Sequence, residues 1–159
     1  MRLREASPVR DVNIVRSLFL EYGESLGFDL CFQDFDTELE ELPGEYASPR
    51  GRILLAEEES EIAGCVALRD LGGGLCEMKR LYVGPGFRGR GTGRALAEEI
   101  VRIAKHEGYE KMRLDTLASM KKAIALYKSM GFGEIEPYRF NPICGAVYLE
   151  LNLVGGDGK

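Results

Sequence analysis

The chain has 159 residues, of which 45% are hydrophobic and 30% charged, and its formal net charge is −5. This size predicts one domain over residues 1–154, which buries about 70% of its unfolded surface, and a flexible tail over residues 155–159. The acidic balance disfavours a nucleic-acid partner, because sequence-independent binders present a basic face to phosphates. No apolar run approaches the roughly 20 residues that span a membrane, and the N-terminus lacks a signal-peptide core, so we expect a cytoplasmic protein with no membrane partner.

The N-terminal half of the chain is predicted to combine short strands with helices. Ser7 and Pro8 suit the start of a helix, because serine caps free amide groups and proline fits the first helical position. The polar turn over residues 58–61 separates the predicted strands over 52–57 and 62–71, which indicates an antiparallel hairpin. In chain order, we expect a strand over residues 3–6, a helix from Ser7 to about Gly27, a loop over 28–36, a short helix over 37–42, and strands over 52–57 and 62–71.

The C-terminal half is predicted to contain two helices among its strands. Leu96, Ala97 and Ile100 recur at helical spacing, which indicates an amphipathic helix. Because this helix carries the chain back across the sheet, the strand after it should run parallel to the strand before it. We expect a strand over residues 75–83, a helix over 93–107, a strand over 112–116, a helix capped by Ser119 and ended by Gly131, and strands over 134–138 and 147–153.

Cysteine and histidine usage argues against a metal site or a disulfide framework. The four cysteines, Cys31, Cys65, Cys76 and Cys144, show no C-x-x-C pairing, and the one histidine is His106. Zinc sites in proteins need closely spaced cysteine and histidine ligands. We therefore predict buried thiols and no metal.

A glycine-rich turn, Arg88-Gly89-Arg90-Gly91-Thr92-Gly93, joins the strand over 75–83 to the helix over 93–107. The first turn of a helix has amide groups without intrahelical acceptors and carries the positive end of the helix dipole. Glycine lets these amides approach an anion closely, and Arg88, Arg90 or Arg94 can add charge-assisted hydrogen bonds. The pattern favours a pyrophosphate site over the alternative, a glycine-rich turn with solvated arginines.

Two other phosphate-binding patterns compete for this turn. A P-loop requires G-x-x-x-x-G-K-S/T, and neither Gly-Lys-Ser nor Gly-Lys-Thr occurs in the chain. A dinucleotide-binding fingerprint fits in part, since Gly89 and Gly91 begin G-x-G and Asp115 ends the next predicted strand. Its third glycine position holds Arg94, however, and too few residues follow Asp115 for the rest of a doubly wound sheet.

Two segments of the chain match patterns of one known family. Arg88-x-x-Gly91-x-Gly93 fits Q/R-x-x-G-x-G/A, and Ala123-x-x-Leu126-Tyr127-x-x-x-Gly131-Phe132 fits A-x-x-L-Y-x-x-x-G-F. In this order they resemble the GNAT superfamily of N-acetyltransferases. The resemblance covers about residues 2–153 and implies an α/β fold: a mixed, mostly antiparallel sheet splayed between its fourth and fifth strands, with helices on both faces. One departure is Met120, where many family members carry asparagine.

The resemblance also implies a co-substrate and its contacts. Acetyl-CoA would donate the acetyl group to an amine acceptor, and family members are often homodimers. Main-chain groups of Leu81, Tyr82 and Val83 would hold the pantetheine arm and polarise the acetyl carbonyl. The pyrophosphate would lie against the turn residues Arg88, Gly89, Arg90, Gly91, Thr92, Gly93 and Arg94.

Glu77 is the candidate general base. An alkylammonium with a pKa near 10.4 is almost fully protonated at pH 7, so removing its proton costs about 4–5 kcal/mol. Some GNAT members place a base at this position on the fourth strand, within reach of the amine directly or through a water. The alternative is a salt bridge with Lys79 or Arg80. Because side chains alternate between the two faces of a strand, Glu77 should share a face with Lys79, Leu81 and Val83. A β-bulge would change which of these residues share that face.

Tyr127 is the candidate general acid. A tyrosine hydroxyl with a pKa near 10 can protonate a leaving thiolate with a pKa near 8.5 at a cost of about 2 kcal/mol. The alternative is a packing role on the apolar stripe of Ala123, Ile124 and Met130. A covalent route through Cys76 is disfavoured, because no histidine lies near it in sequence to activate the thiol.

These observations predict an N-acetyltransferase, in which a primary amine of a small molecule or peptide attacks acetyl-CoA directly in a ternary complex. The alternative is a non-catalytic acyl-CoA-binding or sensing module, because a phosphate cradle alone does not prove turnover. We expect the acidic segment 28–45 to guide a cationic acceptor, and the alternative for this segment is an ordinary solvated helix face.

Overall fold

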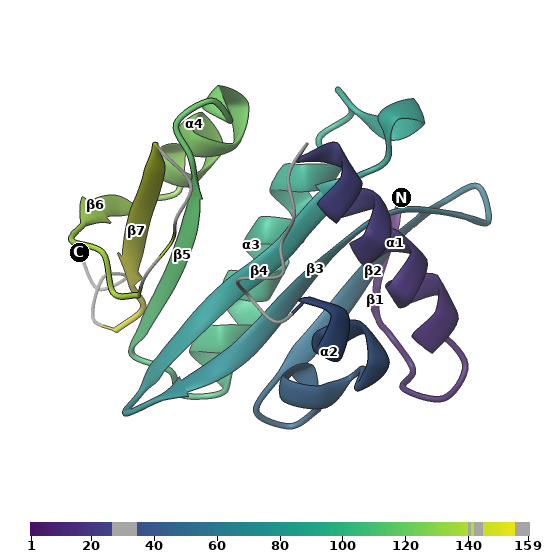
Figure 1. Cartoon of the computed structure of the whole chain (residues 1–159), viewed down its shortest axis with the longest axis horizontal. Helices are drawn as coiled ribbons and strands as arrows, with labels where there is room; N and C mark the ends of the chain where they lie inside the picture. Colours follow the sequence, from purple (N-terminus) through teal and green to yellow (C-terminus); the bar gives the residue numbers. More distant parts are fainter. Residues whose placement is uncertain (27–34, 140, 142–144, 155–159) are drawn as a thin grey trace.

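The structure, a computed structural model, describes residues 1–26, 35–139, 141 and 145–154 (Figure 1). Its strands are β1 (Arg2–Glu5), β2 (Arg52–Glu58), β3 (Glu61–Gly72), β4 (Leu75–Val83), β5 (Lys111–Leu117), β6 (Gly133–Ile135) and β7 (Ala146–Asn152). Its helices are α1 (Val12–Ser25), α2 (Phe35–Glu40), α3 (Thr92–His106) and α4 (Lys121–Ser129), with short 3-10 turns η2 (Gly44–Tyr46) and η3 (Pro85–Phe87). No described helix is long and apolar enough to cross a membrane.

The strands form one sheet in the order β1-β2-β3-β4-β5-β7-β6. β4 and β5 are parallel, as the crossover helix α3 predicts, and the other paired strands are antiparallel. β4 pairs with β5 only from Leu75 opposite Lys111 to Glu77 opposite Arg113, and the two strands then diverge (Figure 1). This divergence confirms the predicted splay between the fourth and fifth strands.

Helices cover both faces of the sheet, and neighbouring residues of one strand belong to different layers. In β2, Ile53 and Leu55 pack with α1 and α2, whereas Leu54 and Ala56 pack with α3. This division follows from the alternation of side chains along an extended strand. Figure 1 shows α1 and α2 in front of the sheet and α3 behind it. The predicted fold class, a mixed sheet with helices on both faces, is confirmed.

The C-terminus of α4 is closed by a glycine cap, as the sequence predicts. Gly131 has a φ of +107°, and its amide donates to the Lys128 carbonyl at 3.1 Å. The Phe132 amide donates to the Tyr127 carbonyl at 3.1 Å, which completes a Schellman motif. The Phe132 ring then packs against the Tyr127 ring with centroids 5.7 Å apart. The glycine and the phenylalanine of the family pattern thus fix the position of its tyrosine.

α1 begins later than the sequence suggested. The helix starts at Val12 with Asp11 at its N-cap, whereas Ser7 and Pro8 precede it. The Ser7 hydroxyl accepts a hydrogen bond from a backbone amide before the helix, at 3.2 Å, so it caps that turn instead. Asp11 pairs with Arg4 of β1 at 2.8 Å. This tertiary ion pair sets the start of the helix, and the sequence around Ser7 could not reveal it.

Other boundaries differ by a few residues. Met120 instead of Ser119 occupies the N-cap of α4, and β6 ends at Ile135 instead of residue 138. α2 begins two residues earlier than predicted, because Phe35 and Leu39 are both buried and packing decides its position. The predicted end of the first helix at Gly27, most of the predicted loop over 28–36 and the tail 155–159 lie outside the described residues.

Candidate active site

The glycine turn, residues 88–94, forms an open cradle at the start of α3. Gly89 and Gly91 have φ values of +81° and +85°, which other residues rarely adopt, and a Cβ at either position would meet no atom within 4 Å. Gly91 is the N-cap of α3, so the amides of the first helical turn have no intrahelical acceptors. The Thr92 hydroxyl donates to Glu58 at 2.9 Å and anchors the turn to the sheet. Exposed backbone amides with room beside them suit a pyrophosphate.

The three arginines of the turn bind protein groups in this structure. Arg88 donates to the carbonyl of Val83 at 2.8 Å, and Arg90 pairs with Glu58 at 2.8 Å. Arg94 donates to the Ser129 hydroxyl at 2.9 Å. The Arg90 and Arg94 side chains are about half exposed, so a phosphate at the turn competes with these surface contacts. Their predicted role as cofactor ligands stays a prediction.

A β-bulge changes which residues of β4 face the two layers. Cys65 of β3 pairs with Tyr82, but Ala67 pairs with Lys79, so one extra residue lies in β4. Arg80 occupies the bulge with a φ of +61°. Lys79 stays on the face of Glu77, as alternation predicts, whereas Leu81 and Val83 turn toward the layer of α3. The bulge therefore places the side chains of Leu81 and Val83 on the face opposite Lys79, whereas Tyr82 packs in the layer of α1 and α2.

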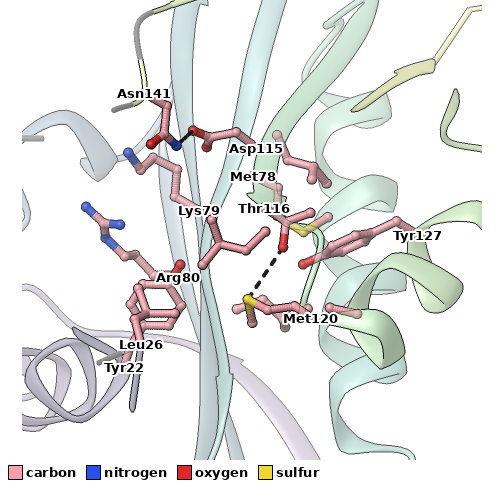
Figure 2. Close-up of a pocket in the computed structure, with 14 residues that line it drawn as sticks. Tyr22, Leu26, Met78, Lys79, Arg80, Asp115, Thr116, Met120, Tyr127 and Asn141 are labelled. Atoms are coloured by element: carbon pink, nitrogen blue, oxygen red, sulfur yellow. Dashed lines mark hydrogen bonds between the residues drawn. The ribbon is translucent and has the colours of Figure 1, made fainter. Parts of the chain in front are cut away.

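A small cavity of ≈ 80 Å³ opens where β4 and β5 diverge (Figure 2). Strand residues 78–81 and 114–117 form its walls, and Tyr22 and Leu26 of α1, Met120, Ala123 and Tyr127 near α4, and Asn141 complete it. A larger groove of ≈ 520 Å³ runs from Arg88 and Gly93 along residues 81–83 to the start of α4. Leu81, Leu117, Met120 and Ala123 line both spaces. One continuous path thus leads from the glycine turn to Tyr127.

Tyr127 lies at the inner end of this path. Its side chain is buried, and Figure 2 shows the hydroxyl directed into the cavity. In the part of the chain that the structure describes, this hydroxyl has no hydrogen-bond partner from the protein. Burial raises the pKa of Tyr127 above its ordinary value, so the hydroxyl keeps its proton at neutral pH. A protonated hydroxyl aimed into a cavity is able to donate a hydrogen bond to a bound group.

Met120 lies beside Tyr127 at the position where many family members carry asparagine. The Thr116 hydroxyl points to the Met120 sulfur at 3.5 Å, a weak contact because sulfur is a poor acceptor. Met120 also lines both the cavity and the groove. The side chain at position 120 is therefore apolar, and it offers no amide group to a substrate.

Glu77 is fully buried within a network of donors. Its carboxylate accepts hydrogen bonds from the Arg69 guanidinium at 2.7 Å and from the Tyr138 hydroxyl at 2.6 Å, and it also pairs with Arg139. The alternative considered from the sequence was a salt bridge with Lys79 or Arg80, whereas the cations that pair with Glu77 here are Arg69 of β3 and Arg139 of the segment after β6. Glu77 does not line the cavity that contains Tyr127. A role as general base stays a prediction, and it requires a relay to the cavity.

Several charged residues at the site were missed from the sequence. Asp115 of β5 accepts hydrogen bonds from Arg139 at 3.1 Å and from Asn141 at 3.2 Å. Lys79 and Arg80 are 8% and 3% exposed, which is unusual for cations. Two consecutive basic residues in a strand whose other residues, Glu77 excepted, are apolar were a signal for this burial. We call Arg69, Glu77, Lys79, Arg80, Asp115 and Arg139 the charged cluster.

Two of the four cysteines lie within the described residues. Cys65 and Cys76 are both buried and free, as predicted, and burial raises the pKa of each thiol to about 12. Neither thiol is therefore ionised at neutral pH. Among the described residues no three histidine, cysteine or acidic side chains converge as metal ligands.

A family model described as "Acetyltransferase (GNAT) family" matches residues 15–132. This chain belongs to the GNAT acetyltransferase family. An uncharacterized N-acetyltransferase of Schizosaccharomyces pombe is 44% identical over 146 residues, covering 91% of this chain and 90% of the relative. The predicted family and the predicted class of enzyme, an N-acetyltransferase, are therefore confirmed.

Solved structures of GNAT proteins share the fold. An acetyltransferase of the GNAT family from Staphylococcus aureus has a TM-score of 0.77 at 21% identity, covering 96% of this chain and 98% of that chain. A structure from Salmonella typhimurium, described with its cofactor acetyl-CoA, has a TM-score of 0.70 at 20% identity, covering 96% and 94%. At these identities the likeness shows the fold.

Proposed function

We propose that this GNAT protein transfers an acetyl group from acetyl-CoA to a primary amine by direct attack in a ternary complex. The observation that carries the proposal is the continuous path from the glycine turn to Tyr127. Its outer end offers helix amides to a pyrophosphate, and its inner end offers a protonated hydroxyl. A long cofactor with a charged end and a reactive end fits this arrangement, and acetyl-CoA in a structural neighbour supports it.

The pantetheine arm would follow the edge of β4 beyond the point where β4 stops pairing with β5. Leu81, Tyr82 and Val83 lie beyond the last pair of the β4 and β5 ladder, and they line the groove. Unpaired backbone groups at a sheet edge hydrogen-bond an extended ligand in the manner of an added strand. The thioester would then lie between Leu81 and Tyr127, where a backbone amide is able to polarise its carbonyl.

Tyr127 would protonate the leaving thiolate. The amine nitrogen forms a bond to the carbonyl carbon, the carbon–sulfur bond breaks, and the sulfur takes the hydroxyl proton. Burial raises the pKa of Tyr127, but the same surroundings raise the pKa of the thiol, so the difference between them governs the transfer. The proton lost by the amine restores the tyrosine through the base and solvent.

Glu77 would accept the amine proton through a relay. Its carboxylate is screened from the cavity, and the Tyr138 hydroxyl donates to it at 2.6 Å. A proton is able to pass to Glu77 through this hydroxyl or through a water. Removing the Tyr138 hydroxyl tests the relay, because it changes no charge within the cluster.

Calorimetric titration with acetyl-CoA and, separately, with NAD tests the cofactor. The proposal predicts saturable binding of acetyl-CoA and none of NAD. A Gly91→Ala variant should weaken this binding, whereas Gly86→Ala should not, because Gly86 has no positive φ and no close neighbour. The absence of acetyl-CoA binding would contradict the proposal. Binding without any amine-dependent release of free thiol would instead indicate a non-catalytic acyl-CoA-binding module.

A further inference from the structure

We propose that Thr116 is a positioning residue for the acetyl transfer, and that its hydroxyl donates a hydrogen bond to the Tyr127 oxygen as Tyr127 protonates the leaving thiolate. This assignment rests on the proposed function, since it concerns the acid of that reaction. It follows from the face of β5 that carries Thr116, from the weak contact that its hydroxyl makes, and from the cavity that Thr116 and Tyr127 both line.

Thr116 lies on the face of β5 that packs around Tyr127. β5 pairs with β7 in unbroken register along its whole length, so its side chains alternate regularly between the two faces of the sheet. Met112 and Leu114 belong to the same core cluster as Tyr127. Thr116 continues this series, whereas Asp115 lies on the opposite face with the charged cluster. The strand therefore presents the Thr116 side chain to the space beside Tyr127.

The Thr116 hydroxyl makes a weak contact in this structure. Among the described residues its hydrogen-bond partner is the Met120 sulfur at 3.5 Å, and sulfur is a poor acceptor. Figure 2 shows the Thr116 and Tyr127 hydroxyls on one side of β4 and the end of Lys79 on the other. The Thr116 hydroxyl therefore loses little when it turns from the sulfur toward an oxygen in the cavity.

Proton transfer from Tyr127 creates a negative charge that its surroundings must stabilise. The O–H bond of Tyr127 breaks as the S–H bond of coenzyme A forms, and the tyrosine oxygen keeps the electron pair. Tyr127 is 7% exposed, so water solvates this phenolate poorly. For the same reason, burial raises the pKa of the Tyr127 hydroxyl. A neighbouring hydroxyl that donates to the oxygen stabilises the anion and makes the tyrosine a stronger acid.

The apolar side chains around Tyr127 do not supply this hydrogen bond. The cavity residues that share its core cluster have no O–H or N–H group in their side chains, and they are Met78, Leu81, Leu114 and Ala123. Met120 contributes a sulfur that carries no proton. On this side of β4, within the described residues, Thr116 is thus the donor that the cavity wall offers to Tyr127.

Replacing the hydroxyl while keeping the side-chain shape tests this role. Thr116→Val does so, and valine suits a strand. We expect kcat for the preferred amine to fall about tenfold, because a hydrogen bond to a charged oxygen is lost, while the dissociation constant of acetyl-CoA stays unchanged. Thr116→Ser is the matched control, since it keeps the hydroxyl and should keep a kcat near that of the native protein. Equal kcat values for Thr116→Val and Thr116→Ser would overturn the role of Thr116 and leave acetyl transfer intact.

A double-mutant cycle with Tyr127→Phe shows whether Thr116 acts through Tyr127. If it does, Thr116→Val lowers kcat in the native protein and has no further effect in Tyr127→Phe, where no phenolate forms. The same loss in both backgrounds would overturn the proposal. Thr116→Ala replaces Thr116→Val in both experiments if Thr116→Val does not fold. If acetyl-CoA binds but no amine reacts, the proposed function itself fails, and the role of Thr116 fails with it.

Discussion

The proposed cofactor side and the proposed acceptor side of this site are built in different ways. At the glycine turn, the backbone amides, the positive φ angles and the helix N-terminus that would bind the cofactor all come from one continuous segment. At the charged cluster, side chains from β3, β4, β5 and the segment after β6 meet in space. A site made of side chains can change its substrate by substitution of a few residues.

Tyr127 stands where the two sides meet, and its removal should have the largest effect. Tyr127→Phe is expected to lower kcat about 100-fold or more, because general acid catalysis contributes at least this much, while the dissociation constant of acetyl-CoA stays unchanged. Tyr109→Phe is the control, since Tyr109 is another buried tyrosine whose hydroxyl binds the Arg50 carbonyl away from the cavity. A kcat for Tyr127→Phe equal to that of the control would show a packing role only.

On the acceptor side, Glu77→Gln should lower both stability and turnover. The substitution leaves Arg69 and Arg139 without their buried counter-charge, and we expect the free energy of unfolding to fall by about 3 kcal/mol. If Glu77 also accepts the amine proton, kcat falls, and the loss shrinks as pH rises and more of the amine is already deprotonated. Denaturant unfolding and pH–rate profiles measure the two effects separately. Lower stability with a normal kcat would leave Glu77 as an ion-pair residue alone.

On the cofactor side, Gly91→Ala should weaken acetyl-CoA binding about tenfold. Gly91 has a φ of +85°, and a residue with a Cβ is strained there by about 1–2 kcal/mol. In the variant, this strain should shift the first turn of α3, so that its backbone amides are no longer placed to bind the pyrophosphate. Calorimetric titration measures the change, with Gly86→Ala as the reference. An affinity equal to the reference would exclude this turn as the phosphate site.

The sequence predicted the local structure of the glycine turn and of the helix after it far better than the contacts of the charged cluster. The turn and the helix that follows it are local, so glycine spacing and helical periodicity identify them. The bulge at Arg80 has no such signal, because Arg80 adopts a φ of +61° without being a glycine. Pairing of Glu77 with Arg69 depends on the register of β3 and β4, and its pairing with Arg139 depends on where the segment after β6 packs. The pair of Arg4 and Asp11 that delays α1 depends on how the turn between β1 and α1 folds back. Contacts between distant segments therefore account for most of what the sequence did not reveal.

The most direct test of the central claim is amine-dependent release of free thiol from acetyl-CoA, with the acetylated amine identified by mass spectrometry in the same reaction. The account predicts equal amounts of thiol and acetylated product with a preferred amine, and the loss of both in Tyr127→Phe. Saturable acetyl-CoA binding with no product from any amine would contradict it.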